Sequence, residues 1–224
     1  MEKKESPKKA SPKIDINTHP KISGLSRRLF GVIKLILGIS LLPFVYSATV
    51  AFYNELGILE KTVTNYFFGG IISFLMIYLF IYEPIIIYNK GQKILEAVFR
   101  FFTPLVKVAP YLLPIYTIIL FLIYLLYSLV SKSNVSIKYF VLLFGFSMGL
   151  HLVFSARSLR LRQSDFLKAN YIFGFSLIYI INLVLLSLCF SFIFDKFSLV
   201  NFSNNSFQMA KNIFYVVFKQ LFLS

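Results

Sequence analysis

Residues 67–88 have the sequence FFGGIISFLMIYLFIYEPIIIY. About 20 apolar residues in a helix cross the roughly 30 Å hydrocarbon core of a bilayer, so this run is long enough to span a membrane. It also carries one carboxylate, Glu83, directly before Pro84. A charged side chain inside a span costs roughly 2.5–3.5 kcal/mol on insertion scales and usually faces a partner, a cavity or a helix end. The stretch therefore predicts a membrane-spanning helix whose acid needs a partner.

The rest of the chain repeats this apolar pattern. Of its 224 residues 58% are hydrophobic, and the mean hydropathy is +0.75. That share exceeds the roughly 45–50% of soluble domains, and the apolar residues lie in long runs. We expect an all-α, polytopic integral membrane protein with five transmembrane helices in one membrane domain, residues 29–194. The expected spans are 29–53, 67–88, 111–130, 138–156 and 170–194.

The segments outside these spans are polar or amphipathic. Residues 1–28 hold eight cations and two Ser-Pro pairs, which predicts a disordered basic tail. In residues 91–107, apolar and charged side chains alternate at helical spacing, which predicts an interfacial helix. The C-terminal segment 195–224 is expected to contain a second amphipathic helix over 207–223, with a sixth span as the weaker alternative.

The distribution of cations predicts the orientation. Five spans place the termini on opposite sides, and cytoplasmic segments carry an excess of Lys and Arg. The N-terminal tail and the connections 89–109 and 157–169 together carry 16 cations, against 6 on the other side. We therefore expect a cytoplasmic N-terminus and a non-cytoplasmic C-terminus. The membrane in which we expect the protein is a bacterial inner membrane.

Three ionisable residues share one predicted depth. Lys34, Glu83 and His151 each lie six or seven residues inside a cytoplasmic basic flank, or about 9–10 Å at 1.5 Å per residue. If their helices are neighbours, Lys34 and Glu83 pair and His151 hydrogen-bonds to either one. The alternative is that Lys34 extends to the membrane surface and that a backbone carbonyl satisfies a neutral His151.

Prolines and glycines mark bends and close contacts. Hinges are expected at four prolines, because proline lacks the backbone N–H that a helix needs: Pro84, Pro104, Pro110 and Pro114. Gly145 and Gly149 have the GxxxG spacing, which predicts close packing of a neighbouring helix.

The basic connection after the fourth span is a candidate contact for lipid headgroups or phosphate, through Arg157, Arg160, Arg162 and Lys168. Motifs for catalysis and metal binding are missing. There is no HExxH, GxSxG or phosphate-binding loop, and the chain has two histidines and one cysteine, Cys189. We expect no catalytic residue, no metal and no cofactor.

Three functions remain open. The first is a non-catalytic scaffold or accessory subunit of a membrane complex. The second is a small transporter or channel-like component that uses the polar layer for protons or a small ion. The third is a membrane enzyme that acts on lipid phosphate. The expected partners are the bilayer, anionic phospholipids at the cytoplasmic face, and a membrane protein or a second copy, without specific nucleic-acid binding.

Overall fold

A computed structural model describes residues 24–130, 137–161 and 171–222, which are helical almost throughout and contain no strand. The elements are α1 (Gly24–Ile58), α2 (Lys61–Met76), a π-helical turn η1 (Ile77–Ile81), α3 (Ile85–Val98), α4 (Thr103–Leu112), α5 (Ile115–Val130), α6 (Ile137–Leu161), α7 (Tyr171–Ile193) and α8 (Leu199–Phe222). Most of the expected basic tail lies outside the described residues, but its last five positions, 24–28, belong to α1.

Four of these helices are long and apolar enough to cross a membrane: Gly31–Ile58, Lys61–Ile81, Ile137–Arg160 and Tyr171–Ile193. They correspond to four of the five expected spans. The fifth, α5, is apolar but has only 16 residues, because the chain breaks before it at Pro114. The all-helical fold class is confirmed, while the described residues give four helices of spanning length instead of five.

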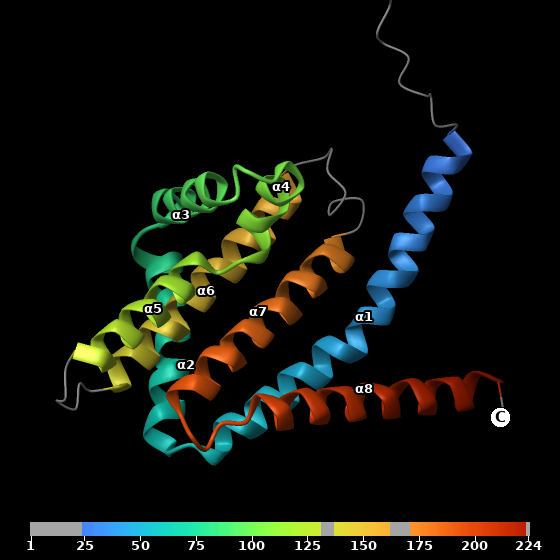
Figure 1. Cartoon of the computed structure of the whole chain (residues 1–224). Helices are drawn as coiled ribbons and strands as arrows, with labels where there is room; N and C mark the ends of the chain where they lie inside the picture. The colour runs from blue at the N-terminus through green and yellow to red at the C-terminus, as the bar shows by residue number, and fades with distance from the viewer. Residues whose placement is uncertain (1–23, 131–136, 162–170, 223–224) are drawn as a thin grey trace, which may run out of the picture.

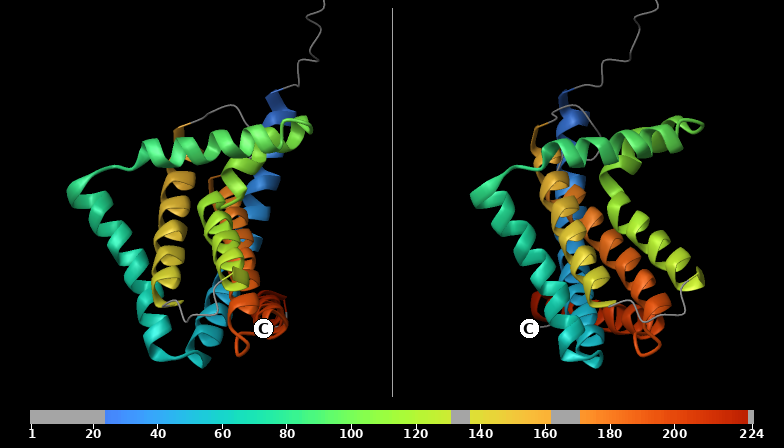
Figure 2. Two further views of the ribbon diagram at one scale, coloured as in Figure 1. Left: turned by 60° about the vertical axis from the view of Figure 1, so that its left-hand side comes forward. Right: turned by 90° about the vertical axis from the view of Figure 1, so that its left-hand side faces the viewer.

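The helices of the bundle run roughly lengthwise, and further helices cross its two ends (Figure 1). α2 packs along α6, and α1 packs against α7 and α8. α3 crosses one end of the bundle, whereas α8 crosses the opposite end, where α1 joins α2 (Figure 2).

Small residues allow α2 and α6 to approach closely. A Cβ atom added to Gly145 would overlap the backbone carbonyl of Phe67, and one added to Gly70 would overlap the carbonyl of Leu142. At Gly149, such a Cβ would lie 2.9 Å from the Phe74 ring. The two backbones therefore meet where side chains are absent, as in other close helix pairs.

The largest core cluster lies between α1, α2, α6 and α7. Phe190, fully buried on α7, has ring centroids at 5.7–6.0 Å from those of Phe52, Phe67 and Phe144. Edge-to-face and tilted rings at this spacing gain more than their buried area alone. Phe197 and Phe202 extend the cluster to the start of α8.

The helix expected over 67–88 does not continue through Glu83. It starts at Lys61, widens into η1 and ends at Ile81, and Tyr82 is extended, with φ −159° and ψ 140°. Pro84 explains the break, because it removes a backbone donor and disfavours a helical conformation for the residue before it. Glu83 therefore lies in a connection between helices, with Pro84 as the N-cap of α3.

The single amphipathic helix expected over 91–107 is two helices. α3 ends at Val98, the chain turns through 99–102, and α4 begins at Thr103 with Pro104 in its first turn. Pro104 starts a helix here because the first turn needs no intrahelical N–H donor. At the other end of the chain, α8 begins at Leu199, eight residues before the amphipathic helix expected over 207–223.

Candidate functional site

The candidate site is built on the end of α4. This helix contains Pro110 and stops at Leu112, and the next residue, Leu113, is extended, with φ −99° and ψ 125°. The last carbonyls of any helix lack intrahelical donors, and Pro114 has no N–H to offer to the carbonyl of Pro110. The break therefore exposes acceptors inside the protein, and these need partners.

Side chains from three helices donate to these carbonyls. Gln92 of α3 donates to the Pro110 carbonyl at 3.5 Å, and Asn182 of α7 donates to that of Leu112 at 3.0 Å. The Tyr111 carbonyl lies 3.1 Å from Nε2 of His151 and 3.3 Å from Oγ of Ser155, both on α6. We call these three carbonyls and their four donors the α4 brace.

Hydrogen-bond directions in the brace follow from the acceptors. A carbonyl can only accept, so His151 carries a proton on Nε2 and Ser155 directs its hydroxyl proton to Tyr111. The Tyr88 hydroxyl, 3.2 Å from Ser155, is then the donor to Ser155. Burial raises the pKa of the Tyr88 phenol, which keeps this donor protonated.

Further polar contacts join α5 to its neighbours. Ser147 donates to the Phe144 carbonyl, so the buried Thr117 of α5 donates to Ser147 at 2.8 Å. Tyr116 donates to the Ile87 carbonyl of α3. A Cβ atom on Gly91 would lie 2.7 Å from the Ile115 side chain, so α3 lies close against the start of α5.

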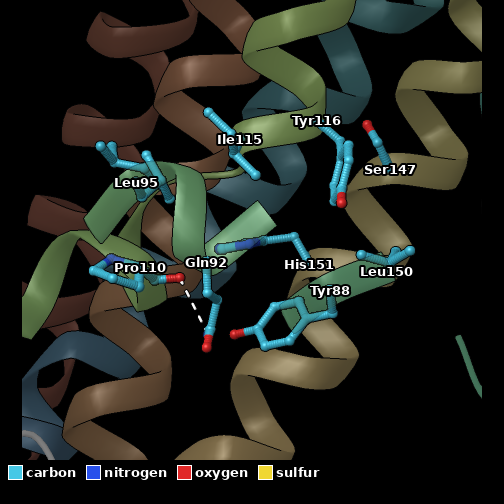
Figure 3. A pocket seen from close by; sticks show the side chains of 10 residues that line it. Tyr88, Gln92, Leu95, Pro110, Ile115, Tyr116, Ser147, Leu150 and His151 are labelled. Atoms are coloured by element: carbon cyan, nitrogen blue, oxygen red, sulfur yellow. Dashed lines mark hydrogen bonds between the residues drawn. The ribbon is translucent and has the colours of Figure 1, made fainter. Parts of the chain in front are cut away.

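A small cavity lies beside the brace, with His151, Tyr88 and Gln92 on one side and Tyr116 and Ser147 on the other (Figure 3). The space open to the centre of a water molecule is about 10 Å³. That is roughly the minimum for one buried water. The site can hold a single small polar molecule while its hydroxyl and imidazole donors remain bonded to other groups of the protein.

Glu83 has a partner that the sequence analysis did not identify. Its carboxylate forms an ion pair with Arg157, near the end of α6, and both side chains are about 40% exposed. His151 bonds instead to the α4 brace, so the two residues have different partners.

Lys34 is buried on α1, one turn before Gly38. A Cβ atom on Gly38 would lie 3.0 Å from the backbone of Phe173, so this part of α1 contacts the start of α7. In Figure 1 the upper part of α1 and the connection between η1 and α3 lie on opposite sides of α6 and α7. The expected polar layer is thus distributed over three places in the bundle.

The basic connection is described only at its start. Arg157 pairs with Glu83, and the guanidinium of Arg160 stacks 5.0 Å from the ring centroid of Tyr171. Arg162 and Lys168 lie outside the described residues. Within the described ranges, no group of three or more His, Cys, Asp or Glu residues lies together as a metal site would require.

Sequence reasoning missed most of the brace, although one signal was present. Ser147, His151 and Ser155 recur every four residues in an apolar helix, which places them on one face. That face meets the break marked by Pro110 and Pro114. Tyr88 and Gln92 gave no such signal, because their role depends on α3 folding back against α4.

Comparison with models of known protein families, with curated proteins and with solved structures gives no match to this chain.

Proposed function

We propose that this protein is an integral membrane protein with five crossings, acting as a non-catalytic scaffold or accessory subunit of a membrane complex. Its N-terminus is cytoplasmic, its C-terminus is not, and a bacterial inner membrane is its location. The four helices of spanning length support the membrane assignment.

The fifth crossing is assigned to α5. Sixteen residues extend about 24 Å, which is shorter than the roughly 30 Å hydrocarbon core. A bilayer accommodates such a helix by local thinning at a modest cost. α5 starts beside α3 and runs toward the end of the bundle that carries α8 (Figure 2), as a crossing helix would.

The environment of α3 supports an interfacial position, because its surface divides into three sectors. Tyr88, Gly91 and Leu95 are buried against the protein. Exposed apolar side chains form the second sector and exposed charged side chains the third: Ile87, Ile94 and Val98 in the former, Lys90, Lys93 and Glu96 in the latter. A helix at a membrane surface beside its own bundle meets protein, lipid and water in this way.

The environment of α8 supports an interfacial position at the end of the bundle opposite α3. Phe202 and Ala210 are buried against the bundle, and Phe214 contacts Phe44 of α1 at 5.7 Å between ring centroids. Asn204 and Lys211 are exposed, as are the aromatic side chains of the last turns. This mixture suits the opposite, non-cytoplasmic interface.

The α4 brace is the observation that carries the scaffold assignment. A transport pathway would direct its polar side chains into a water-filled chamber. Here, polar side chains of α3, α6 and α7 are bonded to the carbonyls of α4 instead. They hold the α3–α4 hairpin across the cytoplasmic end as a rigid platform. The charged sector of α3 faces away from the bundle and is available to a partner.

Cross-linking and co-purification in a mild detergent test this assignment. We expect a stoichiometric membrane partner whose cross-links map to α3, and we expect the double variant Lys90→Glu/Lys93→Glu to lose it. Lys211→Glu, on α8, is the matched control. A protein that purifies alone, or a partner indifferent to the α3 charges, contradicts the scaffold assignment.

A second candidate is a small transporter or channel-like component for protons or a small ion. The interrupted helix α4–α5 beside the buried His151 favours it, since interrupted helices and buried ionisable residues are common at transport sites. Reconstitution in vesicles with a pH-sensitive dye distinguishes the two functions. Proton flux that disappears in His151→Ala or Glu83→Gln supports transport over scaffolding.

A further inference from the structure

An apolar groove lies where α1 and α2 diverge. The two helices separate from their connection as a V (Figure 2), with α6 packed along α2 and α7 along α1. Its lining includes Val50 of α1 and Ile71 of α2, the buried Met148 of α6 and Leu186 of α7, and the exposed Tyr53 and Phe68. The volume is about 320 Å³, at the lower end of the range for ligand pockets.

We propose that this α1–α2 groove binds one acyl chain of a membrane phospholipid. The proposal rests on the membrane placement proposed above and adds a lipid site to it. All four helices of spanning length contribute to the lining, so the mouth of the groove opens into hydrocarbon instead of water.

The depth of the groove agrees with such an occupant. Phe67 lies six residues from the start of α2, and Tyr179 lies fourteen from the end of α7. At 1.5 Å per residue these positions are about 9 Å and about 21 Å from the non-cytoplasmic helix ends. The groove therefore spans the middle of a core roughly 30 Å thick, where acyl chains are the surrounding molecules.

The polar pair at the groove excludes a ligand that needs a hydrogen-bond donor. Thr49 directs its hydroxyl proton to the Val45 carbonyl at 2.7 Å. Tyr179 must then donate to Thr49, at 3.0 Å. Neither proton remains for a carbonyl or ester group on a ligand. A saturated hydrocarbon chain needs none.

The aromatic pair limits how far a chain can enter. Tyr53 and Phe68 have ring centroids 6.3 Å apart, and they bridge α1 and α2 near the connection. The buried Phe52 and Phe67 form a second aromatic pair next to them, with ring centroids 5.8 Å apart. Both pairs line the part of the groove that is nearest the α1–α2 connection, so a chain that enters from the opposite part stops against aromatic rings.

Photo-cross-linking tests the proposal. The full chain, in mild detergent, is irradiated with a small excess of a phospholipid that carries a diazirine near the end of one acyl chain, and the adducts are mapped by mass spectrometry. We expect adducts to concentrate on groove residues. Ile71→Phe fills the groove and should lose most of them, whereas Ile72→Phe, its exposed neighbour outside the groove, should retain them.

Adducts spread evenly over exposed positions such as Phe80, Leu126 and Phe192, and unchanged in Ile71→Phe, overturn the proposal. Val50→Phe fills the groove from α1 and replaces Ile71→Phe if that variant does not fold. Alkaline carbonate extraction separates the two levels of inference. A protein that carbonate releases from membranes contradicts the membrane placement, whereas a retained protein with evenly spread adducts contradicts the groove alone.

Discussion

The Glu55 carboxylate, at the end of α1, accepts a hydrogen bond of 3.1 Å from the backbone N–H of Ser198, 143 positions later in the chain. Glu55 is only 2% exposed. Ser198 itself accepts a bond from the N–H of Asn201 at 3.2 Å, as an N-cap residue does. A negative charge near a helix N-terminus is favourable, so Glu55 anchors α8 to the bundle.

Substituting Glu55 should loosen this anchor in a defined order. Glu55→Gln keeps an oxygen acceptor and loses the charge, whereas Glu55→Leu leaves the Ser198 N–H without its acceptor, at a cost of about 1–3 kcal/mol. We expect unfolding temperatures in the order wild type, Gln, Leu. Cys189 is buried and is the one cysteine of the chain, so a dye that fluoresces on reaction with thiols reports unfolding. Glu60→Leu, at an exposed site, is the control, and a loss as large there contradicts the anchor.

The two donors to the Tyr111 carbonyl should be coupled. His151→Leu or Ser155→Ala alone leaves one donor in place, so each should cost about 1 kcal/mol. The double variant removes both of these donors from a buried carbonyl and should lose more than the sum of the two single losses. The Cys189 dye assay measures all three variants. Thr64→Val, which removes a hydrogen bond to the Leu56 carbonyl, is the control at an independent site. The stability losses of His151→Leu and Thr64→Val should simply add in the double variant. If the losses of His151→Leu and Ser155→Ala also simply add, the result contradicts a shared acceptor.

The ion pair between Glu83 and Arg157 should be weak. Both side chains are about 40% exposed. Exposed ion pairs contribute about 0–1 kcal/mol to stability, because water and salt screen the charges. Glu83→Gln should therefore fold with a small loss of stability that shrinks at high salt. Arg157→Gln should show coupling with it, while Lys34→Ala should be additive. Coupling of Glu83 to Lys34 instead would restore the pairing first inferred from their common depth.

Glycine substitutions test the contact between α2 and α6. Gly70→Ala and Gly145→Ala each place a methyl group against a backbone carbonyl of the other helix, which cannot move aside as a side chain can. We expect losses of about 1–3 kcal/mol or more. Gly69→Ala is the matched control, since nothing lies within 4 Å of its added Cβ, and alanine favours a helix there. Equal effects at Gly69 and Gly70 would be inconsistent with this close packing.

The parts of this fold that depend on local composition could be predicted, and those that depend on long-range contacts could not. The long apolar runs predicted α1, α6 and α7 to within five residues at every end, because hydrophobicity alone defines such helices. The Pro84 break was underestimated because the apolar run continues past it to Tyr88. The partners of Glu83 and Glu55 are 74 and 143 positions away, and no periodicity indicates them. The common depth inferred for Lys34, Glu83 and His151 carried no information on which helix face each residue occupies, so it did not identify their contacts.

Single-cysteine labelling tests the orientation proposed for the chain. Lys93 on α3 and Asn204 on α8 are exposed and belong to helices at opposite ends of the bundle (Figure 1). In a Cys189→Ala background, a membrane-impermeant maleimide added to intact cells should label Asn204→Cys and leave Lys93→Cys unlabelled until the membrane is opened. This follows from an odd number of crossings between α3 and α8, which requires the 16-residue α5 to span despite its length. Labelling of both positions from the same side would remove α5 from the set of crossing helices, because α6 and α7 alone return the chain to the side from which it started.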